Sequence, residues 1–278
     1  VSEILLVDVD QFYGIEIEEF PAQIAQVALW MTDHQMNLRV SEEFGQYFAR
    51  LPLKKAPSII HENALAVDWL NVVDPAKLSY IVGNPPFIGK QHQDERQKAE
   101  IMAAFQGCDD AGLLDYVCAW YRKSLRYMRG NPAIKAALVS TNSIVQGEQV
   151  SALWPILRRD GLEIAFAHRT FQWSSEAKGK AAVQCVIIGF TIHIPEDRWI
   201  FEYEDLKSDS HAIRVGRINP YLVDAPDVFL QNRRSPISTV PEIVWGSMPN
   251  DGGHLLLTDE EKRELLAKEP AAEPLIRR

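Results

Sequence analysis

This sequence has few cysteines, and it has fewer basic residues than acidic ones. The cysteines are Cys108, Cys118 and Cys185, an odd number without metal-ligand spacing, so we expect reduced, buried thiols in a cytoplasmic protein. Lysine and arginine total 29 against 38 aspartates and glutamates, which gives a net charge of −9. This balance argues against a broadly basic protein that coats nucleic acid, although it is compatible with a local basic groove.

Long apolar runs are also missing. The longest, residues 181–194, is interrupted by Gln184 and His193 and is too short to span a bilayer, so no membrane partner is expected. The sequence has no internal repeats and no low-complexity tracts. Its 278 residues are 46% hydrophobic and 24% charged, a composition typical of globular proteins. This length suits one large α/β domain, or one domain and a smaller piece.

The most informative stretch, YIVGNPPFIGK, begins at Tyr80. It predicts a short buried strand that breaks into a stiff turn, Asn84-Pro85-Pro86-Phe87. The two prolines fix φ and remove two backbone N–H donors, so neither a sheet nor a helix can continue through them. The Asn84 side-chain oxygen and the Pro85 carbonyl are left as fixed acceptors, with the Phe87 ring beside them. These groups suit a planar exocyclic amino group, which has two hydrogens to donate and a face to stack.

Asn-Pro-Pro-Phe after a hydrophobic strand resembles the catalytic motif of the S-adenosylmethionine-dependent amino-methyltransferases, the DNA adenine-N6 branch in particular. The resemblance implies that Asn84, Pro85, Pro86 and Phe87 are catalytic residues. A surface turn with a chance pair of prolines is the alternative, because a four-residue motif is short. The flanking segments argue against that alternative.

Upstream of the turn, Phe12–Ile17 predicts a strand that ends in acids and is followed by a helix from Pro21. An acid at the end of such a strand accepts hydrogen bonds from ribose hydroxyls in nucleotide-binding sheets. Glu16 is the candidate and Glu18 the reserve. The competing interpretation is that these acids only lie near a helix N-terminus, where the helix dipole favours them.

A second short strand, Ser58–Ile60, precedes the polar residues of the segment HENAL. In the methyltransferase pattern, the polar residue after this strand contacts the amino group of the cofactor's adenine. By this resemblance, Asn63, followed by Ala64, is the cofactor-binding candidate, and Asp68 is a second one. No second ligand stands at metal spacing from His61, so no metal site is expected.

Downstream of the turn, the polar segment 90–112 predicts a partly mobile region that either closes over substrate or forms a solvated helix face. Residues 113–128 predict an amphipathic helix whose aromatic residues belong to the core. The next strand, residues 134–140, stops at Thr141-Asn142-Ser143. We expect this polar cluster to cap the following helix and to line the same crevice as the turn.

The pattern then continues with a helix, residues 150–159, and two strands, residues 163–168 and 182–190, which predict a hairpin. Between these strands lie two aromatic residues and two lysines. Phe171 and Trp173 are candidates to stack on an extruded base, and Lys178 and Lys180 are candidates to hold phosphates. A core aromatic or a solvated loop explains these four residues equally well.

Taken together, residues 12–190 resemble the methyltransferase region of large single-chain restriction–modification or phage-defence enzymes. The implied fold is α/β: a Rossmann-like class I methyltransferase sheet, mostly parallel, with a late antiparallel hairpin and its first strand missing. Residues 1–195 form the partial catalytic domain in this prediction. Residues 196–278 form a connector and the beginning of a target-recognition domain, including a helix at 260–267 that starts with a capping box from Thr258.

The sequence departs from the family at one point. No glycine-rich turn precedes Glu16, although this turn lets the backbone approach the methionine part of S-adenosylmethionine. We therefore expect a fragment that binds the cofactor poorly and is inactive alone. Its partners would be duplex DNA and the remainder of the polypeptide, which carries the glycine-rich loop and the recognition domain. Alternatives are methylation of a protein glutamine amide, methylation of cytosine N4, and a non-catalytic DNA-recognition or assembly subunit.

Overall fold

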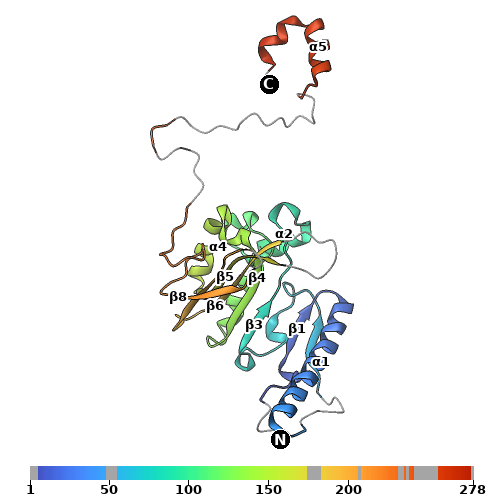
Figure 1. The fold of residues 1–278 in the computed structure, drawn as a ribbon, viewed down its shortest axis with the longest axis vertical. Helices are drawn as coiled ribbons and strands as arrows, with labels where there is room; N and C mark the ends of the chain where they lie inside the picture. The colour runs from blue at the N-terminus through green and yellow to red at the C-terminus, as the bar shows by residue number, and fades with distance from the viewer. Residues whose placement is uncertain are drawn as a thin grey trace. The chain divides into compact units, whose positions relative to one another are not determined.

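The computed structural model describes residues 6–47, 55–173, 183–205, 208–230, 235, 238–240 and 256–276. The chain divides into two compact units, Val1–Gln231 and Asn232–Arg278. All the strands of the described residues belong to the first unit (Figure 1). The described residues of the second unit form one α-helix and one 3-10 helix.

The strands and helices alternate over the first 160 residues, after which strands dominate the first unit. The strands are β1 (Tyr13–Glu16), β2 (Ser58–His61), β3 (Tyr80–Gly83), β4 (Lys135–Thr141), β5 (Glu163–Trp173), β6 (Val183–Thr191), β7 (Arg198–Tyr203) and β8 (Ser210–Val215). The α-helices are α1 (Glu19–Phe44), α2 (Glu95–Ala104), α3 (Cys118–Met128), α4 (Gly147–Arg159) and α5 (Asp259–Lys268). Short 3-10 helices are η1 (Val9–Gln11), η2 (Trp69–Asn71), η3 (Pro75–Lys77), η4 (Lys90–His92), η5 (Asp109–Leu113), η6 (Asn142–Val145) and η7 (Pro270–Leu275).

The strands formed by the described residues make up two sheets. One has six strands in the order β3-β4-β6-β5-β7-β8, and the other contains only β1 and β2. Pairing is parallel in β1–β2, β3–β4 and β5–β7, and antiparallel in β4–β6, β5–β6 and β7–β8. The α/β class and the late β5–β6 hairpin are confirmed. The expectation of a mostly parallel sheet is wrong, because half of the pairings are antiparallel.

This topology gathers strand ends at one edge of the large sheet. β3 runs parallel to β4, and β5 runs in the same direction because both β4 and β5 are antiparallel to β6. β7 is parallel to β5. The carboxyl ends of these four strands therefore meet at one edge, which is where open α/β sheets bind their ligands.

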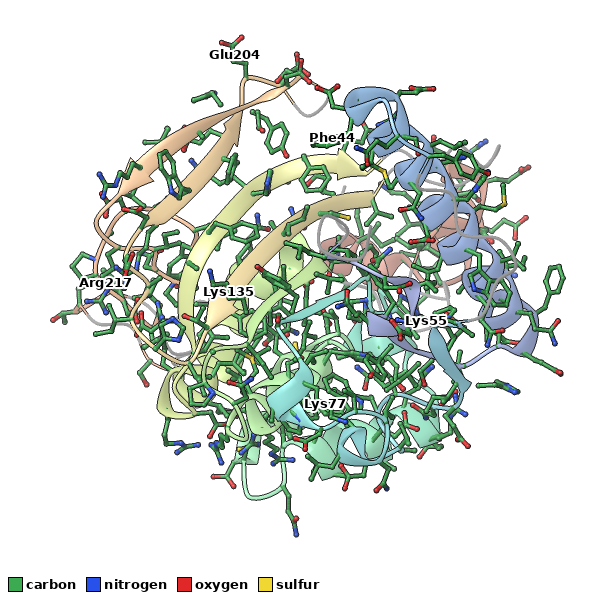
Figure 2. The ribbon with its side chains drawn as sticks, turned by 90° about the horizontal axis from the view of Figure 1, so that it is seen from below. Phe44, Lys55, Lys77, Lys135, Glu204 and Arg217 are labelled. Atoms are coloured by element: carbon green, nitrogen blue, oxygen red, sulfur yellow. The ribbon has the colours of Figure 1, made fainter. Side chains whose placement is uncertain are left out.

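Helices cover one face of the large sheet with apolar residues. Along β4, buried and less buried residues alternate, and Leu138 lies on the buried face. Tyr121 of α3 stacks on Phe190 of β6 at 5.4 Å and bonds Ser140 of β4 through its hydroxyl at 2.8 Å. The aromatic residues of α3 thus belong to the core, as predicted. Figure 2 shows the sheet curving between the β7–β8 end, marked by Glu204, and α1, which ends at Phe44.

Three helix boundaries differ from the sequence prediction. α1 begins at Glu19, ahead of Pro21, because proline is tolerated in a first turn whose N–H groups have no intrahelical partner. α4 begins at Gly147, three residues earlier than expected. α3 begins only at Cys118, since η5 and an irregular stretch precede it.

The expected alternative of a solvated helix face is confirmed for the segment 90–112, most of whose helical residues are exposed. It contains α2, which starts with a capping box between Asp94 and Gln97. Ile101 and Phe105 are buried in the hydrophobic core. Burial of these two apolar side chains thus packs one side of a mostly polar helix against the core.

Three further expectations are corrected. Residues 171–173 are not a loop, because β5 continues through Trp173. The Thr141–Ser143 cluster does not cap a helix through its side chains: neither η6 nor α4 has a side-chain cap bond. Cys118 and Cys185 are buried free thiols, but Cys108 is only half-buried.

The chain beyond residue 195 does not begin as a connector. β7 and β8 pair with each other, and β7 extends the large sheet by pairing with β5. An ion pair between Asp197 and Arg214 links the ends of these two strands. The predicted capping box of α5 is confirmed, since Thr258 and Glu261 bond each other's backbone N–H groups.

Candidate active site

The Asn84–Phe87 turn lies at the carboxyl edge of the large sheet. It follows β3, whose Gly83 pairs with Leu138 of β4. Pro85 is buried and Phe87 is half-buried, whereas Asn84 is exposed. The Asn84 side chain forms no hydrogen bond within the part of the chain that the structure describes. Its amide is therefore available to an incoming polar group.

The residues after the turn are bound to the irregular stretch before α3. The Tyr116 N–H donates to the Ile88 carbonyl at 2.9 Å, and the Lys90 N–H donates to Asp115 Oδ1 at 3.0 Å. Gln93 Nε2 adds a bond to the Leu114 carbonyl at 2.9 Å. These contacts hold the downstream side of the turn against the body of the first unit.

A cavity of about 600 Å³ opens where this segment meets the end of β4. Its walls are residues 89–91, Asp115, Thr141 with Ser143, and residues 146–149 at the start of α4. Thr141 and Ser143 line this cavity, whereas residues 84–87 are not among its lining residues, so the prediction that the cluster shares one crevice with the turn stays a prediction. The walls present backbone, hydroxyl, amide and carboxylate groups, so the cavity is suited to a polar ligand with several hydrogen-bonding positions.

Three charged side chains line the cavity: Asp115, Lys90 and Glu148. Asp115 is 8% exposed and accepts a hydrogen bond from Ser143 Oγ at 2.6 Å. Lys90 forms an ion pair with Glu148 across the cavity wall. Burial, and next the negative charge of Asp115, raise the pKa of the nearby Cys118 thiol well above its usual value. Cys118 is thus a neutral thiol, unsuited to act as a nucleophile.

The cofactor-binding candidates follow β1 and β2. Glu16 ends β1, and its Oε1 accepts a hydrogen bond from the Glu18 N–H at 3.2 Å. Asn63 follows β2, and its side chain is engaged at both ends: Nδ2 donates to Glu100 Oε1 at 2.6 Å, and Oδ1 accepts from the Leu65 N–H at 2.9 Å. Asp68 is exposed and accepts from the Leu70 N–H to start η2.

These residues fit part of S-adenosylmethionine. A carboxylate has two oxygens, so Glu16 can accept from ribose hydroxyls while it keeps its backbone bond. The Ala64 carbonyl accepts from Trp69 Nε1 at 2.9 Å, which fixes the backbone around Asn63. A backbone held in one conformation in this way suits hydrogen bonding to the edge of an adenine ring. No glycine-rich turn in the sequence is available for the methionine part.

The substrate-binding candidates lie further along the sheet. Phe171 pairs with Cys185, which pairs with Thr141, so Phe171 lies two strands away from the cavity wall. Its ring stacks on Tyr203 at 5.4 Å. Trp173 ends β5, and its side chain is not described. Lys178 and Lys180 lie outside the described residues.

Several site residues were missed by the sequence prediction, chiefly Asp115, Gln149 and Lys90. Asp115 is a single acid in the apolar run LLDYV, and a charge inside such a run is a signal of a buried, hydrogen-bonded carboxylate. Gln149 carries no comparable signal, because a glutamine in the first turn of a helix is common on surfaces.

Within the described ranges, no group of three or more histidine, cysteine, aspartate or glutamate side chains could hold a metal ion. No helix in the described part of the chain has the length and apolar character needed to cross a membrane.

Comparison with known proteins identifies the family of this chain. The family described as the MmeI DNA-methyltransferase domain matches residues 2–202, and the MmeI target recognition domain matches residues 224–278. The chain is 39% identical over 276 residues to DNA methyltransferase A of Bacillus subtilis (strain 168). The aligned region covers 98% of this chain and 31% of that protein.

Among solved structures, the Type IIL restriction-modification enzyme MmeI in complex with DNA is 51% identical to this chain. The TM-score is 0.90, and the match covers 99% of this chain and 37% of the MmeI chain. The chain thus spans about a third of the length of these relatives. On its sequence match over residues 2–202, the chain belongs to the MmeI DNA-methyltransferase domain family.

Proposed function

We propose that this chain is the catalytic part of a restriction–modification protein that transfers a methyl group to adenine N6 in duplex DNA. The observation that carries the proposal is the Asn84–Phe87 turn, whose exposed amide stands at the carboxyl edge of the sheet without a partner among the described residues. Membership of the MmeI family and similarity to a DNA-bound MmeI enzyme support it.

The chemistry that the turn performs follows from its acceptors. Rotating the target adenine out of the duplex costs about a few kcal/mol, because the base loses its stacking. Asn84 Oδ1 and the Pro85 carbonyl accept its two amino hydrogens, which draws the nitrogen lone pair out of conjugation with the ring. Phe87 packs on the base and fixes its plane. No covalent intermediate is needed, and catalysis arises mainly from orientation.

S-adenosylmethionine, which DNA methyltransferases of this kind generally use, supplies an electrophilic methyl group when it is bound. Glu16 would hold its ribose, and Asn63 and Ala64 its adenine, with Asp68 as a further contact. Asn63 Nδ2 and Oδ1 each form one hydrogen bond with the described residues, so a second donor position and a second acceptor position of the amide support this assignment.

DNA contacts are proposed for the end of β5 and the residues that follow it. Phe171 and Trp173 are candidates to stack on the extruded base, and Lys178 and Lys180 to hold phosphates. The partner is duplex DNA, read by the region matched by the target recognition domain. The proposed location of the whole protein is the cytoplasm.

The test uses the protein with its flanking regions, expressed in a host that lacks N6-methyladenine. Sequencing that detects modified bases should find N6-methyladenine at one recurring DNA sequence. Asn84→Ala should abolish the modification, because one of two acceptors is lost, while calorimetry shows cofactor binding largely unchanged. Asn71→Ala, an exposed residue of η2, is the matched control and should methylate normally.

Other outcomes separate the alternatives. N4-methylcytosine at the recurring sequence would assign the turn to cytosine. Methylated glutamine in a host protein, without methylated DNA, would assign it to a protein substrate. Duplex binding without any methylation would leave a recognition or assembly subunit. Near-normal methylation by Asn84→Ala would contradict the proposed catalytic turn.

A further inference from the structure

One carboxylate joins the two walls of the cavity beside the turn. Asp115 Oδ1 accepts from the backbone N–H of Lys90, and Oδ2 accepts from Ser143 Oγ at the end of β4. These partners lie 25 and 28 residues away along the chain, so the contact is purely tertiary.

The turn forms few hydrogen bonds of its own with the described part of the chain. Its two prolines have no N–H to donate, and Asn84 has no hydrogen-bond partner within the described residues. Upstream, β3 lies at the edge of the large sheet, and among the residues that the structure describes it pairs only with β4. The first fixed points downstream are the bond of Ile88 to Tyr116 and the bond of Lys90 to Asp115.

The carboxylate is held by neutral donors. No ion pair of Asp115 is formed in the described ranges, and its third donor is Gln149 Nε2 at 3.4 Å. Gln149 is oriented in turn, because its Oε1 accepts from the Asp115 N–H at 3.2 Å and its Nε2 donates to the Leu113 carbonyl at 2.6 Å. Hydrogen bonds to a buried carboxylate are strong and directional, so they fix atoms rather than only attract them.

We propose that Asp115 is a positioning residue for methyl transfer: it holds the backbone that follows Asn84–Phe87 at a set distance from the end of β4. The proposal rests on the proposed function of that turn. Asp115 does not touch the base. It fixes the distance between the acceptors of the turn and the opposite wall of the cavity. A misplacement of about 1 Å can lower the rate of a positioned reaction by about 100-fold.

The experiment compares Asp115→Ala with Asp115→Asn in the protein that carries its flanking regions. Asp115→Ala should lower kcat about 100-fold, with the KM for S-adenosylmethionine and the affinity for DNA unchanged. Asp115→Asn should recover most of the rate, because its oxygen can accept from the Lys90 N–H and its amide can donate to Ser143 Oγ. Asp110→Asn, exposed in η5, is the matched control and should equal the unsubstituted protein.

A spectroscopic readout separates positioning from folding. With 2-aminopurine at the target adenine, Asp115→Ala should keep the fluorescence rise that marks base extrusion while methylation slows. Parallel loss of fluorescence, cofactor binding and rate would instead mean a merely structural role, and would overturn the proposal. A kcat within threefold of the unsubstituted protein, or equal impairment of the alanine and asparagine variants, would overturn it as well.

If Asp115→Ala does not fold, Ser143→Ala carries the test, because it removes one hydrogen bond between the walls. It should lower kcat about tenfold, the effect of weakening one of two anchors by about 1.4 kcal/mol. An unchanged kcat would overturn the proposal. Failure of the function itself has a different signature: the unsubstituted protein would bind DNA and form no N6-methyladenine.

Discussion

At the scale of single residues, Asn84 and Asp115 have opposite environments. Asn84 is exposed and has no hydrogen-bond partner among the described residues, whereas Asp115 is buried and accepts three hydrogen bonds. An unengaged amide is free to bind a ligand, and a fully engaged carboxylate is suited to hold its surroundings still. The proposed division between a catalytic residue and a positioning residue follows from this difference.

His168 of β5 is a further residue with an unusual environment. Its ring stacks on Phe201 at 4.2 Å, with 5° between the planes, and its Nδ1 lies 2.8 Å from the Tyr203 hydroxyl. Burial lowers the pKa of His168 below the usual value for histidine. The folded protein therefore favours the neutral imidazole.

This lowered pKa predicts a pH dependence of stability. Between the ordinary histidine pKa of about 6.5 and the lower folded value, the unfolded chain binds more protons than the folded chain, so the free energy of unfolding falls as pH falls. His168→Gln removes this contribution. Lowering the pH from 7 to 5 should therefore reduce the stability of the unsubstituted chain more steeply than that of His168→Gln. Thermal unfolding at a series of pH values measures this difference.

His211→Gln, on the exposed surface of β8, is the control and should retain the steeper dependence. Identical slopes for the unsubstituted chain and His168→Gln would contradict the prediction.

At the scale of elements, the β5–β6 hairpin depends on one close contact. Phe166 of β5 pairs with Gly189 of β6, and a Cβ added at Gly189 would lie 2.1 Å from the Phe166 ring. A register shift between Ile164 and Phe166 adjusts β5 at this point. The absence of a side chain at Gly189 thus lets the aromatic ring lie across the neighbouring strand.

Gly189→Ala should destabilise the first unit by about 1–3 kcal/mol, because the ring or the strand must shift to admit the methyl group. Urea unfolding of the chain measures the difference. Gly216→Ala is the matched control, since no atom lies within 4 Å of a Cβ added there.

Adding Phe166→Leu to Gly189→Ala should cost less than the sum of the two single substitutions, because the leucine removes the clash. Equal stability of Gly189→Ala and Gly216→Ala would show that the contact is not limiting.

At the scale of the whole molecule, the two sheets leave strand edges unpaired. Among the described residues, β1 pairs only with β2, and β3 pairs only with β4. Tyr80 and Val82 of β3 are 65% and 78% exposed. Both edges belong to parallel pairs, so one further parallel strand could pair with each of them. The glycine-rich turn that this sequence lacks would be expected on such a strand.

We infer that a further parallel strand between β1 and β3 would complete the cofactor site. The chain alone should therefore bind S-adenosylmethionine weakly in calorimetric titration, and a longer chain that includes its upstream region should bind it tightly. Hydrogen exchange should be fast at β3 in the short chain and slow in the longer one, because paired backbone N–H groups are protected.

Glu16→Ala in the longer chain is a second check, and should weaken cofactor binding by one lost carboxylate contact. Tight stoichiometric binding by the chain alone would contradict the inference.

The sequence by itself determined the features that depend on neighbours along the chain. The Asn84–Phe87 turn follows from two prolines, the β5–β6 hairpin from two apolar runs around a polar link, and the start of α5 from the Thr258–Glu261 capping box. Each depends on φ restriction, side-chain periodicity or a hydrogen bond within four residues. Such effects act before any long-range contact forms.

Only the tertiary structure decided the remainder. The engagement of Asp115 with Lys90 and Ser143, the stacking of Phe171 on Tyr203, and the addition of β7–β8 to the large sheet all join distant segments. Their partners depend on which strands lie side by side and in which register, and local sequence patterns do not specify this. A buried carboxylate is stable only where folding brings its donors to it, and so the walls of the cavity emerge from the fold.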